Sequence, residues 1–303
     1  MIRIVYMGTP DYACRILEEL LAAEGIEVAL VLTQPDRPVG RKRILTPPPV
    51  KVLAEEAGIE VLQPETLRDP KLQTRLQAEA PDFIVVAAYG QLLPREVLAI
   101  APCINLHASL LPRYRGASPV QQALLEGDRF TGVTAMLMEE GLDSGPALAY
   151  SYLEIGAPME LPELMEALTE SAAALTPKVL RRFDALQPLP QYDALASHCR
   201  KIRRQDGEVD LSDAEELHRK SRAFAGWPGV FLPGGLKLLE IEPLDEEGSH
   251  RPGEILALGE ESVELGCARG SVRVHRLQAP GKKAMSARAY CVGRGLKRGD
   301  TLL

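Results

Sequence analysis

The first 33 residues alternate between strand-like and helix-like patterns, and this alternation constrains the fold more than any other feature of the chain. Residues 2–7 are an apolar run typical of a buried strand, and Gly8-Thr9-Pro10-Asp11 predicts a turn into an amphipathic helix that ends near Glu24. Residues 28–33 read as a second strand. A strand–helix–strand unit predicts parallel pairing, a right-handed crossover and ligand binding at the carboxyl ends of the strands.

Further strand-like runs and a long helical stretch follow this strand–helix–strand unit. Three strand-like runs, at residues 83–87, 103–107 and 133–138, predict an open, mostly parallel, Rossmann-like sheet of the α/β class. A helical stretch at 161–186 ends at Gln187-Pro188-Leu189-Pro190, a run that disfavours helix.

The C-terminal third has a different composition of elements. One helix near residues 213–224 is followed by short β-like runs at 236–241, 254–258 and 272–277, separated by Gly and Pro turns, as in a small β-barrel. We therefore predict a catalytic domain at residues 1–186, a linker at 187–205 and a second domain at 206–303.

Charge is distributed unevenly along a chain whose formal net charge is −7. Residues 34–51 contain five basic residues against one acidic residue, and residues 271–303 contain eight against one. Both segments have the charge to bind phosphates, although solvated charged surfaces have the same composition. Prolines and Gly40 predict an irregular loop over residues 34–51, and a loop this long in a compact α/β domain is typically functional or disordered.

Several classes of protein have no support in the sequence. No basic region precedes an apolar run at the N-terminus and no apolar stretch reaches 18 residues, so neither export nor membrane spanning is expected. The five cysteines are dispersed without a CxxC pair, which disfavours structural zinc and disulfides and fits a reducing cytoplasm. The glycine-rich dinucleotide motif and the Walker A motif are both missing.

The polar residues with the clearest chemical potential follow the third strand-like run. Asn105 and His107 lie two positions apart on the predicted strand 103–107, so both side chains project from one face. A carboxamide can donate a hydrogen bond to a developing oxyanion, and an imidazole can exchange a proton near neutral pH. A capping Asn and a structural His would give the same pattern.

Asp143 is the third candidate. It lies in Gly141-Leu142-Asp143-Ser144-Gly145, a tight loop after the strand-like run 133–138, and we expect this loop to present Asp143 to the same sheet edge. There it would orient His107 and stabilise the charged imidazole. An aspartate that only bonds its own turn is the alternative.

Together these residues resemble a known family. NLHASLLPRYRGASPVQQALL, followed by GLDSG, is similar to the signature of the folate-dependent formyltransferase superfamily. Blocks across nearly the whole chain, including MGTPDYA, AAYGQLLP, FAGWPG and APGKKAMSA, resemble its methionyl-tRNA formyltransferase branch. Two positions depart from the pattern: Ser144 replaces the usual threonine, and the segment around Ser197-His198-Cys199 lacks the common Tyr-Ala.

The resemblance implies a set of site residues. Asn105, His107 and Asp143 match the catalytic set, and Ser109-Leu110-Leu111-Pro112 matches the segment that binds tetrahydrofolate. Expected tRNA contacts are Arg41, Lys42 and Arg43 in the acceptor-stem loop and Lys282 and Lys283 in the OB-like domain.

The resemblance also implies a reaction. The formyl group of 10-formyltetrahydrofolate moves to the α-amino group of methionine on initiator tRNA, in the cytoplasm, in an enzyme expected to act as a monomer. No metal is expected, because an N10-formyl amide is already electrophilic. The alternatives are a glycinamide ribonucleotide formyltransferase or a formyl-folate hydrolase with the same three residues, and a catalytically idle RNA-binding protein on this fold. Sequence alone leaves open the role of His107 as base or charged donor, and how initiator tRNA is distinguished.

Overall fold

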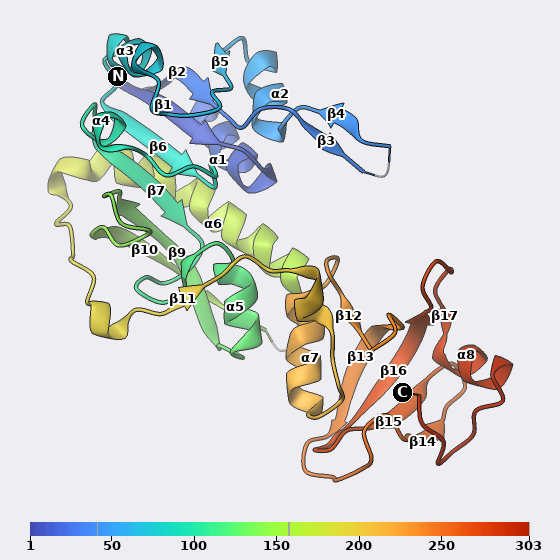
Figure 1. Ribbon diagram of the computed structural model, residues 1–303. Coiled ribbons are helices and arrows are strands. Elements are labelled where there is room, and N and C mark those ends of the chain that lie inside the picture. Colours follow the sequence, from blue (N-terminus) through green and yellow to red (C-terminus); the bar gives the residue numbers. More distant parts are fainter. Residues whose placement is uncertain (41, 157, 303) are drawn as a thin grey trace. The chain divides into compact units, whose positions relative to one another are not determined.

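The computed structural model of the chain describes residues 1–40, 42–156 and 158–302 (Figure 1). The chain folds into two units, each assembled from more than one segment. The first contains Met1–Pro119, Arg129–Gly156 and Glu163–Arg200, and the second contains Val120–Asp128, Ala157–Pro162 and Lys201–Leu303. The assignment of catalysis to residues 1–186 and of tRNA binding to 206–303 stays a prediction.

A seven-stranded sheet organises the first unit, in the order β10-β9-β7-β6-β1-β2-β5. Its strands are β1 (Ile2–Gly8), β2 (Ile26–Leu32), β5 (Val61–Leu62), β6 (Phe83–Ala87), β7 (Cys103–His107), β9 (Phe130–Leu137) and β10 (Ala147–Glu154). Its helices are α1 (Asp11–Ala22), α2 (Pro49–Glu56), α3 (Pro70–Ala78), α4 (Arg95–Leu98) and α6 (Leu161–Arg182), of which Leu161 and Pro162 belong to the second unit. Helix α5 (Pro119–Leu125) belongs to the second unit except for Pro119.

The sheet is mostly parallel, as predicted. β7, β6, β1, β2 and β5 pair in parallel, whereas β9 pairs antiparallel to both β7 and β10. Only β9 therefore runs against the other strands. The observed strands 26–32 and 130–137 begin two to three residues before the predicted ones, because apolar periodicity locates a strand better than its ends. The α/β, Rossmann-like prediction for this unit is confirmed.

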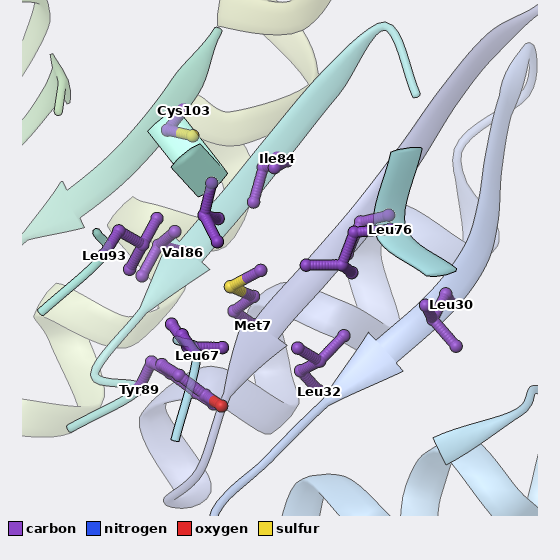
Figure 2. Packing of buried hydrophobic residues seen from close by; sticks show 12 residues of the cluster. Met7, Leu30, Leu32, Leu67, Leu76, Ile84, Val86, Tyr89, Leu93 and Cys103 are labelled. Carbon is purple, nitrogen blue, oxygen red and sulfur yellow. The ribbon is translucent and has the colours of Figure 1, made fainter. Parts of the chain in front are cut away.

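Helices cover both faces of this sheet. Tyr6 on β1 donates a hydrogen bond to the Ala13 carbonyl of α1, and α1 is joined to α6 by the ion pair between Arg15 and Glu170 at 2.8 Å. Residues that alternate with Tyr6 and its neighbours along these strands form a hydrophobic core on the other face of the sheet (Figure 2). That core includes Met7, Leu32, Ile84, Val86 and Cys103 from the sheet, packed with Leu76 of α3 and Val97 of α4. Burial on two faces explains why these strands read as continuous apolar runs.

The basic segment after β2 is more regular than predicted. β3 (Arg37–Val39) and β4 (Ile44–Thr46) form a two-stranded antiparallel hairpin within the segment predicted to be irregular. Pro38 pairs with Leu45, between the pairs 37–46 and 39–44. A proline is tolerated there because a two-stranded ladder leaves alternate N–H positions facing away from the partner. The prediction of an irregular loop was therefore wrong for residues 37–39 and 44–46.

The segment predicted as a linker makes ordered contacts with the first unit. The 3-10 turn Phe183–Ala185 precedes it, and the 3-10 turn Asp193–Leu195 lies within it. Leu189 bridges to Ala147, and β11 (His198–Cys199) pairs in parallel with β8 (Arg115–Gly116). Residues 187–200 belong to the first unit by these contacts. A polar, proline-containing stretch looks like a linker in sequence because its partners lie far away along the chain.

The second unit contains an antiparallel sheet in the order β12-β13-β16-β15-β14, with β17 also paired to β16. Its elements are the 3-10 turn Arg204–Gly207, α7 (Ala214–Ala223), β12 (Val230–Phe231), β13 (Lys237–Asp245), β14 (Ile255–Leu258), β15 (Val263–Gly266), β16 (Ser271–Gln278), β17 (Met285–Ser286) and α8 (Ala287–Gly293). The predicted β-sheet is confirmed, but over residues 201–302 no ladder joins its outer strands into a closed barrel.

None of the helices in the described part of the chain combines the length and apolar character that crossing a membrane requires.

An ion-pair network at the start of β1 generates a prediction about acid stability. Glu79, at the end of α3, is nearly buried and pairs with both Arg75 and Arg3. The hydrogen bond from Arg75, helped by Arg3, holds the pKa of the Glu79 carboxyl below its usual range against the opposing effect of burial. A pKa lowered in the folded state contributes stability above the unfolded pKa, and this contribution disappears as pH falls through the folded pKa.

We expect Glu79→Gln to lower the free energy of unfolding by about 1 kcal/mol at neutral pH, because two arginines lose a charged partner. The difference from the parent should disappear as the pH falls through the lowered pKa of Glu79 in the folded parent, because the parent carboxyl is then also protonated. Urea titrations at a series of pH values measure this. The matched control is Glu55→Gln, which changes an exposed glutamate of α2. A difference that is independent of pH would contradict the assignment.

Candidate active site

β7 places two of the predicted site residues on one face. Asn105 and His107 lie two positions apart on this strand, which β6 and β9 flank. Asn105 is half-buried, and His107 is 6% exposed. The i, i+2 spacing therefore gives a shared face, with Asn105 the more accessible of the two.

Asp143 reaches these residues by a route that the sequence did not indicate. We expected its loop to leave a strand at the same sheet edge as His107. Because β9 is antiparallel to β7, however, its carboxyl end at Leu137 lies beside Ile104. The loop then returns, and it brings Asp143 Oδ1 to 3.5 Å from Asn105 Nδ2 and Oδ2 to 3.7 Å from His107 Nδ1. The three predicted side chains are thus brought together.

The two nitrogens of His107 have different neighbours. Nε2 lies 2.9 Å from the carbonyl oxygen of Tyr114, and a carbonyl can only accept, so Nε2 carries a hydrogen. Nδ1 faces Asp143 at a distance too long for a direct hydrogen bond but short enough for an ion pair when the ring is charged. Nδ1 is therefore the nitrogen left for proton exchange.

The Asp143 carboxylate has a fixed donor in addition to Asn105. The backbone N–H of Gly116 donates to Oδ2 at 2.8 Å. Gly116 has a φ of +121°, and a Cβ at this position would lie 2.2 Å from the carbonyl oxygen of Cys199. Only glycine fits this conformation and this close approach. Gly116 thus ties the position of the carboxylate to the pairing of β8 with β11.

Residues from the predicted linker support the 114–118 turn. Ser197 Oγ accepts a hydrogen bond from the Tyr114 N–H at 2.9 Å, and the Cys199 thiol donates to the Tyr114 carbonyl at 3.4 Å. Cys199 Sγ also accepts from the Ser118 N–H at 3.3 Å. Burial raises the pKa of this thiol, which keeps it a neutral donor. The carbonyl that binds His107 is therefore held by the same segment.

Residues 109–112 form a braced turn next to β7. The Ser109 hydroxyl donates to the Arg113 carbonyl at 2.6 Å, and the Leu111 N–H donates to Thr134 Oγ1 at 3.0 Å. Ser109 and Leu111 are buried, whereas Leu110 and Pro112 are half-exposed. Leu110 and Pro112 are therefore the two side chains of this segment that are accessible at the surface.

The predicted tRNA-binding residues lie outside this cluster. Lys42 and Arg43 are exposed in the turn of the β3–β4 hairpin, and Arg41 lies outside the described residues. Lys282 and Lys283 are exposed between β16 and β17 of the second unit. There they line a hollow of about 450 Å³ together with Tyr290 and Arg294, whose guanidinium lies 4.5 Å from the centre of the Tyr290 ring.

Reasoning from the sequence missed Gln191, Ser197 and Cys199. Gln191 Nε2 donates to the carbonyl oxygens of Asp143 at 2.9 Å and Gly145 at 2.7 Å. Composition gave no signal for these residues. The sequence did show that the segment around Ser197-His198-Cys199 lacks the Tyr-Ala common in the family. This segment is the one that contacts Tyr114.

Over residues 1–40, 42–156 and 158–302, no group of three or more His, Cys, Asp or Glu side chains is arranged to hold a metal ion.

Two family models and many curated proteins match this chain. The model of the Formyl transferase family matches residues 2–180, and that of the Formyl transferase C-terminal domain matches residues 201–295. A curated methionyl-tRNA formyltransferase of Sulfurovum sp. (strain NBC37-1) is 56% identical over 99% of both chains.

Solved structures share the fold at much lower identity. HypX from Aquifex aeolicus in complex with tetrahydrofolic acid has a TM-score of 0.60 and 22% identity, over 98% of this chain and 48% of that chain. An N-formyltransferase from Helicobacter canadensis, in complex with folinic acid and dTDP-3-aminofucose, has a TM-score of 0.67 and 16% identity, over 90% and 98% of the two chains. At 56% identity to the Sulfurovum relative along its whole length, the chain belongs to the methionyl-tRNA formyltransferase family.

Proposed function

We propose that this chain transfers the formyl group of 10-formyltetrahydrofolate to the α-amino group of methionyl initiator tRNA. The observation that carries the proposal is the convergence of Asn105, His107 and Asp143 in a chain that is 56% identical to a methionyl-tRNA formyltransferase. In this reaction a new C–N bond forms between the formyl carbon and the methionine nitrogen. The bond from the formyl carbon to N10 of the folate breaks, and the attacking nitrogen loses a proton.

Each of the three residues has a role in that exchange. The formyl oxygen gains negative charge as the neutral amine attacks, and the half-exposed Asn105 amide donates to it with the hydrogen that does not face Asp143. His107 exchanges the proton of the amine through Nδ1, because Nε2 is bound to the Tyr114 carbonyl. Asp143 orients the imidazole and stabilises its charged form during transfer.

The donor is held, in this proposal, beside residues 109–112, with Leu110 and Pro112 as the side chains that touch it. The bracing of this turn by Thr134 and Arg113 supports that role, because a fixed turn limits the entropy lost on binding. The transfer is proposed to proceed without a metal, since the N10-formyl group already has an electrophilic carbon.

The acceptor is bound through phosphate contacts of the basic segments. We assign this role to Lys42 and Arg43 of the hairpin, to Arg41, which precedes them in the sequence, and to Lys282 and Lys283 of the second unit. The division into residues 1–186 for catalysis, 187–205 as connection and 206–303 as an OB-like tRNA-binding domain is part of the proposal, as are action as a monomer and location in the cytoplasm. The Arg294–Tyr290 pair beside Lys282 supports a nucleic-acid surface, because aromatic and guanidinium planes stack on bases.

A formyl-transfer assay with 10-formyltetrahydrofolate tests the function. Charged initiator methionyl-tRNA, glycinamide ribonucleotide and water are offered as acceptors in separate reactions. Rapid transfer to the tRNA is expected. Transfer only to glycinamide ribonucleotide or to water would leave the three-residue chemistry intact and reject the proposed acceptor.

The role of His107 predicts the effect of removing its imidazole. We expect His107→Ala to lower kcat by about 10²-fold or more, as for loss of a general acid–base group, while tRNA affinity changes little. The matched control is His198→Ala, which removes an exposed imidazole from β11. Single-turnover rates and filter binding measure the two effects, and an unchanged rate in the His107 variant removes it from the mechanism.

The basic residues between β3 and β4 should make tRNA binding depend on the salt concentration. Replacing Arg41, Lys42 and Arg43 together by Gln should weaken tRNA binding. The plot of log K against log salt should also become less steep, by about 0.9 in slope for each phosphate that the variant no longer neutralises. Folate binding should be unchanged. Arg68→Gln with Lys71→Gln is the control, since both residues are exposed near α3. Equal salt slopes in the hairpin variant and the parent would reject the assignment.

A further inference from the structure

Asp143 is held in place by hydrogen bonds to both its side chain and its backbone. Its carboxylate accepts from the Gly116 N–H, and its backbone carbonyl accepts from Gln191 Nε2 at 2.9 Å. The same Nε2 also donates to the carbonyl oxygen of Gly145, at 2.7 Å. Asp143 has a φ of +50°, in the left-handed region that few non-glycine residues adopt. Its conformation therefore depends on partners outside the loop.

The orientation of Gln191 is set by Arg115. The Arg115 guanidinium is 7% exposed, and its Nε donates to Gln191 Oε1 at 3.0 Å. Arginine has donors only, so it selects the oxygen end of the amide and turns both N–H hydrogens toward the 143–145 loop. Nη1 of the same guanidinium binds Asp193 at 2.9 Å, which anchors the arginine on the segment that carries Gln191.

We propose that Gln191 is a positioning residue for the reaction: oriented by Arg115, it fixes the backbone of Asp143 and Gly145 so that the Asp143 carboxylate stays against Asn105 and His107. This assignment rests on the proposed function. Its consequence is specific, because a carboxylate displaced by about 1 Å no longer orients the imidazole, and misplacement of this size can lower turnover by about 10²-fold.

Two substitutions separate positioning from simple packing. Gln191→Ala removes the whole amide. Gln191→Glu keeps the size and the oxygen that accepts from Arg115, but it puts an acceptor without hydrogens against two carbonyl oxygens. Leu195→Ala is the matched control, since Leu195 is 67% exposed on the same segment.

The kinetic test measures kcat and KM for both substrates, the pH profile of kcat, and Tm. Both Gln191 variants should lower kcat by about tenfold or more with a changed pH profile, while KM for tRNA stays within about twofold, and Leu195→Ala should match the parent. Three results would each overturn the proposal: kcat within about twofold of the parent in both variants, full activity in Gln191→Glu alone, or a loss equal to that of Leu195→Ala.

A second readout is independent of activity, so it still decides the role of Gln191 if the parent fails to formylate tRNA and the proposed function falls. In the full chain labelled with ¹⁵N-histidine, His107 is assigned by comparison with His107→Gln. The Nδ1 resonance of His107 should shift in both Gln191 variants and remain in place in Leu195→Ala. An unshifted resonance in the Gln191 variants would show that Asp143 does not depend on Gln191.

Discussion

The close approach of the backbone at Gly116 to the carbonyl oxygen of Cys199 is the constraint on which the site depends. A side chain at this position would lie 2.2 Å from that oxygen, and the φ of +121° also requires glycine. Only with glycine can β8 pair with β11 while the Gly116 N–H points at Asp143. One residue without a side chain therefore links a catalytic candidate, a turn and a distant segment of the chain.

That link explains why the 114–118 turn carries so many hydrogen bonds. The Tyr114 carbonyl accepts hydrogen bonds from His107 Nε2 and the Cys199 thiol, while the Tyr114 N–H donates to Ser197 Oγ. A buried imidazole needs a partner that selects one tautomer, and a carbonyl oxygen does so because it cannot donate. The support of the turn thus determines which nitrogen of His107 is available for chemistry.

In our proposal, the chemistry and the choice of acceptor reside in different parts of the chain. The three catalytic candidates lie in the first unit, and their geometry fits acyl transfer to any neutral amine. In the proposed function, the polyanionic acceptor is selected by positive charge outside the catalytic candidates, which we assign to Lys42 and Arg43 of the hairpin and to Lys282 and Lys283 of the second unit. The negative net charge of the whole chain is consistent with this arrangement, because the local excess, not the sum, attracts phosphates.

Features that repeat at short range could be predicted from the amino-acid sequence. Apolar runs predicted β1, β6 and β7, and the two-residue spacing of Asn105 and His107 placed both on one face. The tertiary structure alone decided that β9 runs antiparallel, that Pro38 lies in a hairpin, and that Gln191 reaches back to Asp143. Periodicity records which face of an element is buried. Periodicity does not indicate which distant carbonyl oxygen accepts a hydrogen bond from a side-chain amide, because such contacts form only when the whole chain packs.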